Sequence, residues 1–210
     1  IIGGSGFGRE VKTLIDQINI HKPQYEILGF YDDNTSLPKA INNVPYLGKL
    51  DDLMKSKEKF SAAMGIGIPL LKEKVFEKIK KLDLDFPPLI HPSVIIGKDN
   101  IHIGQGCIIC AGNILTCDIK VGDFVTLNLS CTVGHDTSLG NFSSFMPSVN
   151  ISGDVQVMNN VYVGTGAKII NNLTIGSNSI IGAGAVVAKS IPADCTAVGI
   201  PAKPIKFNKE

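Results

Sequence analysis

One of the four histidines, His135, stands directly before an acidic residue, Asp136. A histidine beside a carboxylate can act as a general base on a hydroxyl or an amine, because the acid stabilises the imidazolium that forms. A zinc site of the carbonic anhydrase kind needs three convergent histidines, and only His102 accompanies His135 within the repeats described next. The pair therefore predicts proton transfer without a metal. The alternative is a solvated turn with an incidental histidine.

The residues around His135 keep a strict period of six. Every sixth residue from position 103 to position 187 is apolar, and glycine often follows it, as at Gly134 and Gly164. Neither the period of a strand nor that of an α-helix produces this pattern. Three six-residue sides close a triangular coil, and coils stack at a strand spacing of about 4.8 Å. The period predicts a left-handed parallel β-helix. Ile96 and Ile103 are seven residues apart, which predicts a one-residue bulge near Asn100 or Ile101.

Coil stacking places residues eighteen positions apart in one column. Gly153 follows His135 in its column, so we expect a niche with an exposed backbone N–H that could hold a developing oxyanion. The next column contains only carboxylates, Asp118, Asp136 and Asp154. Such carboxylates raise one another's pKa unless a cation joins them, and an imidazolium is one. A base and an oxyanion donor suffice for acyl transfer from a thioester. Direct attack is favoured over a covalent route through Cys117.

The first part of the chain alternates strand and helix. An apolar start runs into Gly3-Gly4-Ser5-Gly6-Phe7-Gly8 and then a helix over residues 9–18; further strands are expected at 27–31 and 60–68, and helices at 50–55 and up to residue 81. The glycine turn could bind phosphate at a helix N-terminus. Three interpretations remain open: a nucleotide or nucleotide-sugar site, a merely tight turn, and a nicotinamide site, which would need a second half-sheet.

These patterns predict two domains. A small Rossmann-like α/β domain covers residues 1–86, and the β-helix domain covers residues 87–210. The last segment contains Pro201 and Pro204 and is expected to form an extended strap rather than a further coil.

Composition excludes several classes of function. Twenty Lys and Arg against nineteen Asp and Glu give a net charge of +1, which argues against nucleic acid or an anionic membrane as partner. No apolar run reaches the roughly 18 residues of a spanning helix. The five cysteines are odd in number and scattered, as in a reduced cytoplasmic protein without a disulfide framework.

Five segments together resemble the NeuD/PglD-type sugar acyltransferases, over essentially the whole chain. The segments are Gly4-Ser5-Gly6-Phe7-Gly8, Asp32-Asp33, Leu89-Ile90-His91-Pro92, Asn128 with Gly134-His135-Asp136, and Val198-Gly199-Ile200-Pro201-Ala202-Lys203. The resemblance implies that His135 is the general base, that Asp136 is its acid partner, and that the Gly153 N–H meets the thioester carbonyl.

The same resemblance implies the binding residues. Acetyl-CoA would contact Ser144, Thr165 and Ala183, and Asn128 would lie near the acceptor. The nucleotide-sugar would contact Ser5, Gly6, Phe7, Asp32, Asp33 and Gly67. Ser144 replaces a histidine found in part of the family, and Phe7 replaces a polar residue. The resemblance also implies a homotrimer with acetyl-CoA in the groove between neighbouring β-helices.

The sequence therefore predicts an acetyl-CoA-dependent acetyltransferase acting on a hydroxyl or amino group of a sugar. We expect the sugar to be nucleotide-linked, the setting to be bacterial surface glycan synthesis, and the acceptor to attack directly. One alternative is an acetyltransferase for a small non-sugar acceptor such as an amino acid. Another is a non-catalytic β-helix scaffold that binds a nucleotide-sugar.

Overall fold

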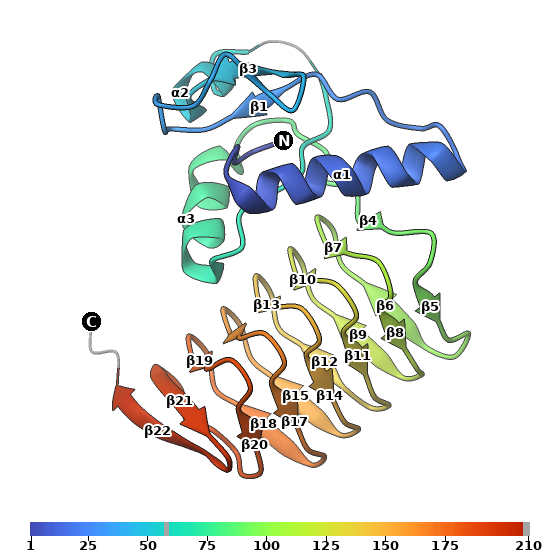
Figure 1. Cartoon of the computed structure of the whole chain (residues 1–210), viewed down its shortest axis with the longest axis vertical. Helices are drawn as coiled ribbons and strands as arrows, with labels where there is room; N and C mark the ends of the chain where they lie inside the picture. Colours follow the sequence, from blue (N-terminus) through green and yellow to red (C-terminus); the bar gives the residue numbers. More distant parts are fainter. Residues whose placement is uncertain (57–58, 208–210) are drawn as a thin grey trace.

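The computed structural model describes residues 1–56 and 59–207, and they form a small α/β region seated on one end of a stack of triangular coils (Figure 1). Helix α1 (Gly6–His21) lies along the first coils. Residues 208–210, at the end of the predicted β-helix domain, lie outside the described residues. No helix of the described residues is long and apolar enough to cross a membrane.

The coils form three sheets, one for each side of the triangle, and all their strands are parallel except β22. The first sheet contains β4 (Leu89–Ile90), β7 (Ile108–Ile109), β10 (Thr126–Leu127), β13 (Ser144–Phe145), β16 (Tyr162–Val163), β19 (Ile180–Ile181), β21 (Cys195–Gly199) and β22 (Ala202–Phe207). The second contains β5 (Ile95–Ile96), β8 (Ile114–Leu115), β11 (Thr132–Val133), β14 (Asn150–Ile151), β17 (Lys168–Ile169) and β20 (Val186–Val187). The third contains β6 (Ile101–Ile103), β9 (Ile119–Val121), β12 (Ser138–Leu139), β15 (Val155–Val157) and β18 (Leu173–Ile175).

The predicted register is confirmed. Val133 pairs with Leu115 below and Ile151 above, so a coil contains eighteen residues. Every sixth residue is buried inside the stack from Ile109 to Val187, and only Ile103 is partly exposed. A continuous core of small and branched side chains results, and its burial is the main stabilising term of the coils.

The predicted bulge is also confirmed. Ile96 pairs with Leu115, nineteen positions on, whereas Ile101 pairs with Ile119, eighteen positions on. One extra residue therefore lies between them, next to Asn100, which has a left-handed φ of 49°.

Left-handed residues also turn the corners of the coils, six residues apart. Gly106, Gly112, Gly166 and Gly184 have φ between 64° and 75°. Asparagine, aspartate or serine occupies most of the other corners, as this conformation favours. Two corners hold a bulky residue instead: Phe124 and Phe142.

The α/β region has a parallel sheet built on the first residues of the chain. Ile2 bridges Tyr31 on one side and Met64 on the other, and β1 (Phe30–Tyr31) pairs with β3 (Val44–Gly48). A short antiparallel strand, β2 (Ala40–Ile41), was not expected from the sequence. Three helices form where the sequence predicted them, although their first and last residues differ from the prediction: α1, α2 (Leu50–Leu53) and α3 (Pro69–Ile79). The strands expected at 27–31 and 60–68 are shorter or reduced to single bridges.

The last segment is extended, as expected, but it is paired into the first sheet instead of lying as a separate strap. Strand β21 continues the first sheet by pairing with β19, and β22 folds back on it as a hairpin. Pro201 lies in the hairpin turn, where it needs no ladder bond. The register shifts between Thr196 and Ala197, beside Pro204, so the bulge accommodates a residue without an N–H.

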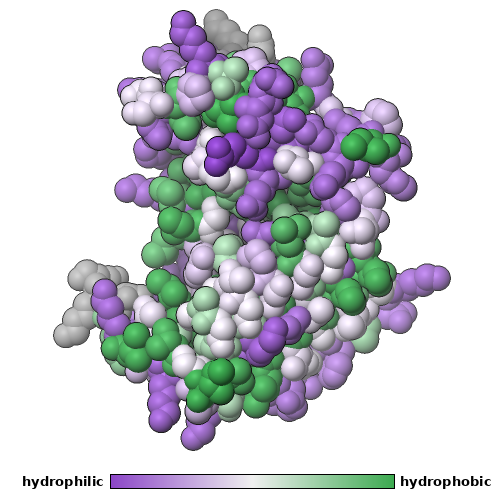
Figure 2. Space-filling model, viewed as in Figure 1, coloured by the Kyte–Doolittle hydropathy of each residue, from purple (hydrophilic) through white to green (hydrophobic). Residues whose placement is uncertain are grey.

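On the face shown in Figure 2, hydrophobic side chains are more frequent over the coil stack than over the α/β region. Exposed apolar side chains of the coils include Ile95, Ile114, Leu129, Met158, Ile170 and Ile180.

Candidate functional site

His135 lies at the corner between the second and third sheets, just after β11. Its Nδ1 is 2.8 Å from Oδ2 of Asp136. An ionised carboxylate only accepts hydrogen bonds, so Nδ1 carries the proton and donates it, and Nε2 keeps its lone pair. Both side chains are more than half exposed, at 59% and 56%. The imidazole is therefore held in the tautomer that leaves Nε2 as a base.

The pKa of His135 is raised above its ordinary value. The hydrogen bond to Asp136 is the largest cause, and the charges of Asp136, Asp154 and Asp118 act in the same direction against partial desolvation. Asp118 also accepts a hydrogen bond from a side chain of the coil below: Asn100 Nδ2 donates to its Oδ1 at 2.8 Å. The acidic column thus makes His135 a stronger base.

Gly153 lies one coil above His135, directly against the imidazole ring. A Cβ atom at Gly153 would be 2.5 Å from Cε1 and 2.9 Å from Cδ2 of the imidazole. Its φ is outside the left-handed region, so only the ring requires glycine here. Gly153 is buried, and the expected open niche is wrong, because the imidazole itself fills the space. Within residues 1–56 and 59–207 the N–H of Gly153 donates to no backbone or side-chain acceptor.

Three groups at this corner could approach a cation. Ligand atoms of His135, Asp136 and Asp154 all lie within 4.8 Å of one another, and all three residues are exposed. Asp136 is already bound to the imidazole, so the same arrangement supports proton transfer.

Cys117 lies one coil below His135. Its thiol has a raised pKa, caused first by desolvation and then by the charge of Asp118. A thiol with a raised pKa is a poor nucleophile because little thiolate is present. The corner therefore favours base catalysis over a cysteine nucleophile.

The glycine turn and Asp32 form a second group, in the α/β region. Asp32 Oδ2 accepts from the Gly4 N–H at 2.7 Å, and its Oδ1 accepts from the Asn34 N–H at 2.8 Å. Asp32 thereby holds the turn to the end of β1. Ser5 and Gly6 are exposed at the start of α1.

Three further predicted residues of the α/β region lie around the same turn. The Phe7 ring is 4.0 Å from the position of a Cβ on Gly67. Asp33 accepts from the Leu50 N–H at 3.0 Å and so caps α2. Phe7 and Gly67 are thus brought together with the turn, whereas the Asp33 carboxylate is engaged structurally.

The predicted acetyl-CoA residues do not lie together. Thr165 and Ala183 are exposed and stack at the corner between the first and second sheets, where Gly184 N–H donates to Thr165 O at 2.8 Å. Ser144 is fully buried on the first sheet. Its hydroxyl is bound to a lysine of α3, described below.

Asn128 is buried beside α1 and is not accessible to an acceptor in this structure. It is 5% exposed, and its Nδ2 is 3.5 Å from Oε2 of Glu10. Its own Oδ1 accepts from the Leu129 N–H at 2.7 Å.

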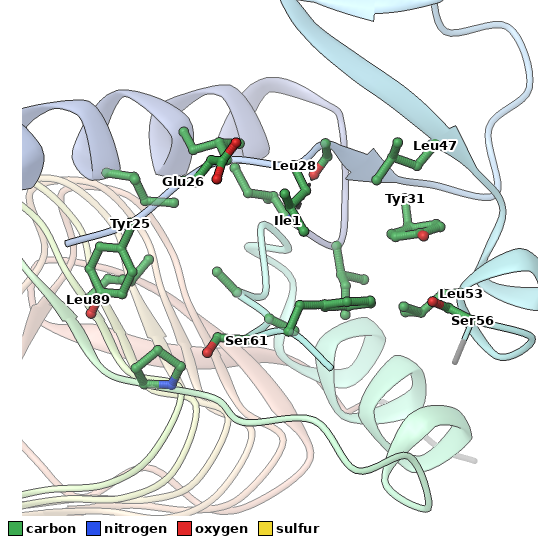
Figure 3. A pocket seen from close by; sticks show the side chains of 18 of the residues that line it. Ile1, Tyr25, Glu26, Leu28, Tyr31, Leu47, Leu53, Ser56, Ser61 and Leu89 are labelled. Atoms are coloured by element: carbon green, nitrogen blue, oxygen red, sulfur yellow. Dashed lines mark hydrogen bonds between the residues drawn. The ribbon is translucent and has the colours of Figure 1, made fainter. Parts of the chain in front are cut away.

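The sequence did not indicate a pocket of about 570 Å³ in the α/β region. Figure 3 shows Ile1, Leu28, Tyr25 and Ser61 around it. These residues precede the strand segments around Ile2, Phe30–Tyr31 and Met64, so the pocket is at the amino ends of the strands, away from the glycine turn. Nucleotides bind outside the carboxyl ends of such sheets. The pocket is therefore distinct from the glycine-turn group.

Sequence reasoning also missed Lys72, which is 1% exposed on α3. One signal was available. Lys72 is three residues from both Pro69 and Val75, which places it on the apolar face of the helix.

The six-residue repeats and the stacked parallel coils define the class of hexapeptide-repeat acyltransferases with a parallel β-helix. Residues 1–79 match the PglD N-terminal domain model, and residues 154–189 match the model of the bacterial transferase hexapeptide with six repeats. GDP-perosamine N-acetyltransferase from Escherichia coli O157:H7 is 28% identical over 98% of this chain and 95% of that protein.

Two solved structures extend the comparison. The acetyltransferase domain of PglB from Neisseria gonorrhoeae FA1090 is 30% identical with a TM-score of 0.90, covering 97% of both chains, and it is also known in complex with acetyl coenzyme A. PerB from Caulobacter crescentus, in complex with CoA and GDP-perosamine, is 28% identical with a TM-score of 0.85, covering 98% of this chain and 95% of that chain. The chain belongs to the NeuD/PglD-type family of sugar acetyltransferases and is an acyltransferase.

Proposed function

We propose that this protein transfers the acetyl group of acetyl-CoA to the amino group of a nucleotide-linked sugar. One observation carries the proposal: the His135 imidazole is held by Asp136 through Nδ1 and stacked on Gly153, with Nε2 left as a base. The similarity to GDP-perosamine N-acetyltransferase supports an amino group over a hydroxyl. The proposed setting is surface glycan synthesis in the bacterial cytoplasm.

In the proposed mechanism the acceptor amine attacks the thioester carbonyl directly. Nε2 of His135 takes the proton that the amine loses, and Asp136 stabilises the imidazolium. The C–N bond forms, the carbonyl oxygen becomes an oxyanion, and the N–H of Gly153 donates to it. Collapse breaks the C–S bond, and the coenzyme A sulfur leaves with a proton from the imidazolium.

The proposed acceptor site is the glycine turn. Ser5 and Gly6 are exposed at the N-terminus of α1, where unpaired N–H groups favour a phosphate. Phe7 and Gly67 form the side of the turn, and Asp32 holds it in place. Asp33 would support the acceptor site indirectly, because it accepts from the Leu50 N–H and so fixes the start of α2.

We place acetyl-CoA between copies of the chain in a homotrimer. Thr165 and Ala183 are at a different corner from His135, so a donor that contacts all three needs a neighbouring β-helix. Exposed apolar side chains on the flat sides of the coils, such as Ile114 and Ile180, suit such contacts. Ser144 and Asn128 would act through the protein framework, as both are buried.

The direct test is turnover by the purified protein with acetyl-CoA and GDP-, UDP- or dTDP-linked 4-amino sugars. Release of the coenzyme A thiol and the mass of the product measure transfer to the amine. Preference for serine or another free amino acid would support the non-sugar alternative. Binding of the nucleotide-sugar without release of coenzyme A would support a scaffold.

A second prediction concerns Asp136→Asn. The base works only when neutral, so kcat/KM rises with pH through the raised pKa of His135. The amide in Asp136→Asn would no longer supply the charged hydrogen-bond acceptor that is the largest cause of the raised pKa of His135. The acidic limb of the profile is therefore expected to move to lower pH while the plateau rate falls. An acidic limb at the wild-type position would show that Asp136 does not set this pKa; Asp154→Asn is the matched control, with a smaller shift in the same direction.

A further inference from the structure

Lys72 is the only charged side chain with under 9% exposure among the described residues. Its Nζ donates to Phe124 O at 2.7 Å, Thr126 Oγ1 at 3.0 Å and Ser144 Oγ at 3.1 Å. An ammonium has three donors, so these acceptors satisfy it completely. All three belong to the β-helix, whereas Lys72 belongs to α3.

The bonds do not serve to bury an ion pair. Desolvation lowers the pKa of Lys72 to about 7, and no carboxylate accepts from its Nζ within the described ranges. The titratable group acting on it is Cys107, a buried thiol whose pKa is itself raised to about 11. What the Lys72 amine contributes at this position is therefore a set of directional hydrogen bonds, not an ion pair.

The rest of α3 lies along one corner column of the coils. Phe76 packs on Phe124 and Phe142, with ring centroids 4.6 Å and 5.7 Å apart. Further along the column, Asn160 Nδ2 donates to Oε2 of Glu73 at 2.8 Å. Phe124 and Phe142 adopt φ of 56° and 61°, a strained conformation for a bulky residue. Contact with α3 offsets the strain at this column.

Helix α3 also continues from the proposed acceptor site. It begins at Pro69, two residues after Gly67, and Lys72 lies in its first turn. The Phe7 ring lies beside Gly67, 4.0 Å from the position that a Cβ there would occupy. Apolar contacts are non-directional, whereas three hydrogen bonds fix the rotation and the height of the first turn of α3.

We propose that Lys72 is a positioning residue that sets the orientation of the α/β region, and with it the glycine turn, relative to the β-helix that bears His135. The part of the proposal that concerns the acceptor rests on the proposed function. The part that concerns domain orientation can be tested without a substrate.

The test compares Lys72→Met with Lys74→Met, an exposed lysine two residues along the same helix. Spin labels on non-natural residues at Lys39 and Lys189, both exposed, report the distance between the two parts of the chain. We expect one narrow distance distribution in the wild type and in Lys74→Met, and a broad or shifted one in Lys72→Met. Thr126→Val removes a single acceptor and is the milder variant if Lys72→Met folds poorly. Unchanged distributions in both Lys72→Met and Thr126→Val would overturn the proposal.

Kinetics test the functional part. Lys72→Met is expected to lower kcat for the nucleotide-linked amino sugar about 10- to 100-fold, since a displacement of about 1 Å can have that effect. The Kd of the nucleotide and the KM of acetyl-CoA are expected to stay unchanged. A lower Tm with kcat unchanged would mean a purely structural role and would overturn the positioning claim. A wild type that acetylates no nucleotide-linked sugar contradicts the proposed function instead, and the label distances still decide the role of Lys72.

Discussion

His135→Ala is expected to lower kcat by about 10²- to 10⁴-fold, because the variant has no base to take the proton of the attacking amine. The KM of acetyl-CoA is expected to change little, since the proposed contacts of the donor with Thr165 and Ala183 are at another corner and remain intact. Steady-state release of the coenzyme A thiol, measured with the nucleotide-linked amino sugar, gives both constants.

His21→Ala is the control for this substitution. His21 is exposed at the end of α1 and has no place in the proposed chemistry. A kcat for His135→Ala within a few-fold of the wild type, with the fold intact by circular dichroism, would contradict base catalysis. Acetylation of Cys117 in a donor-only incubation would contradict direct attack.

Gly153→Ala is expected to lower kcat by about 10²-fold although it keeps the N–H. The new methyl group would lie 2.5 Å from Cε1 of His135, so the imidazole must turn away from its position beside Asp136. The rate falls because the displaced imidazole is no longer aligned with the proton that it must take from the acceptor. The backbone needs no glycine here, since the φ of Gly153 is outside the left-handed region. Single-turnover kinetics and the pKa of His135 by NMR measure the displacement.

Two controls separate this effect from a general disturbance of the coil. Asn171→Ala changes the same corner position one coil along and should leave kcat unchanged. In a His135→Ala background, Gly153→Ala should have almost no further effect on rate or Tm, because no ring remains to be displaced. Additive losses in the double variant would mean that Gly153 acts independently of the ring.

Much of the fold could be predicted because the period of six is a local pattern with one physical solution. It gave the register of the coils and located the extra residue before Ile101. It also predicted which residues share a column, so that Gly153 is found next to His135, one coil above it. Sharing a column does not determine the side-chain rotamer of His135, however. The observed rotamer places the imidazole in the niche that the spacing alone predicted to be open.

Contacts between distant segments could not be predicted in the same way. Lys72 bonds to Ser144, seventy-two positions away, so the burial of both depends on where α3 rests. Lysine is rarely buried, and its place on the apolar face of α3 was the one local hint. The hairpin β21–β22 was missed because two prolines argued against pairing, and only the observed turn and bulge accommodate them.

The corner residues have a consequence for how such an enzyme can diversify. A corner side chain contacts the coils above and below it but not the other corners of its own coil. His135 occupies one corner, Thr165 a second, and the Phe124 column a third. Substitutions at one corner can therefore accumulate without disturbing the others. With the proposed function, the triangular coil would keep the His135 base, the donor contacts and the attachment of α3 at three separate corners, so that the acceptor sugar could change while the corner of the base is retained.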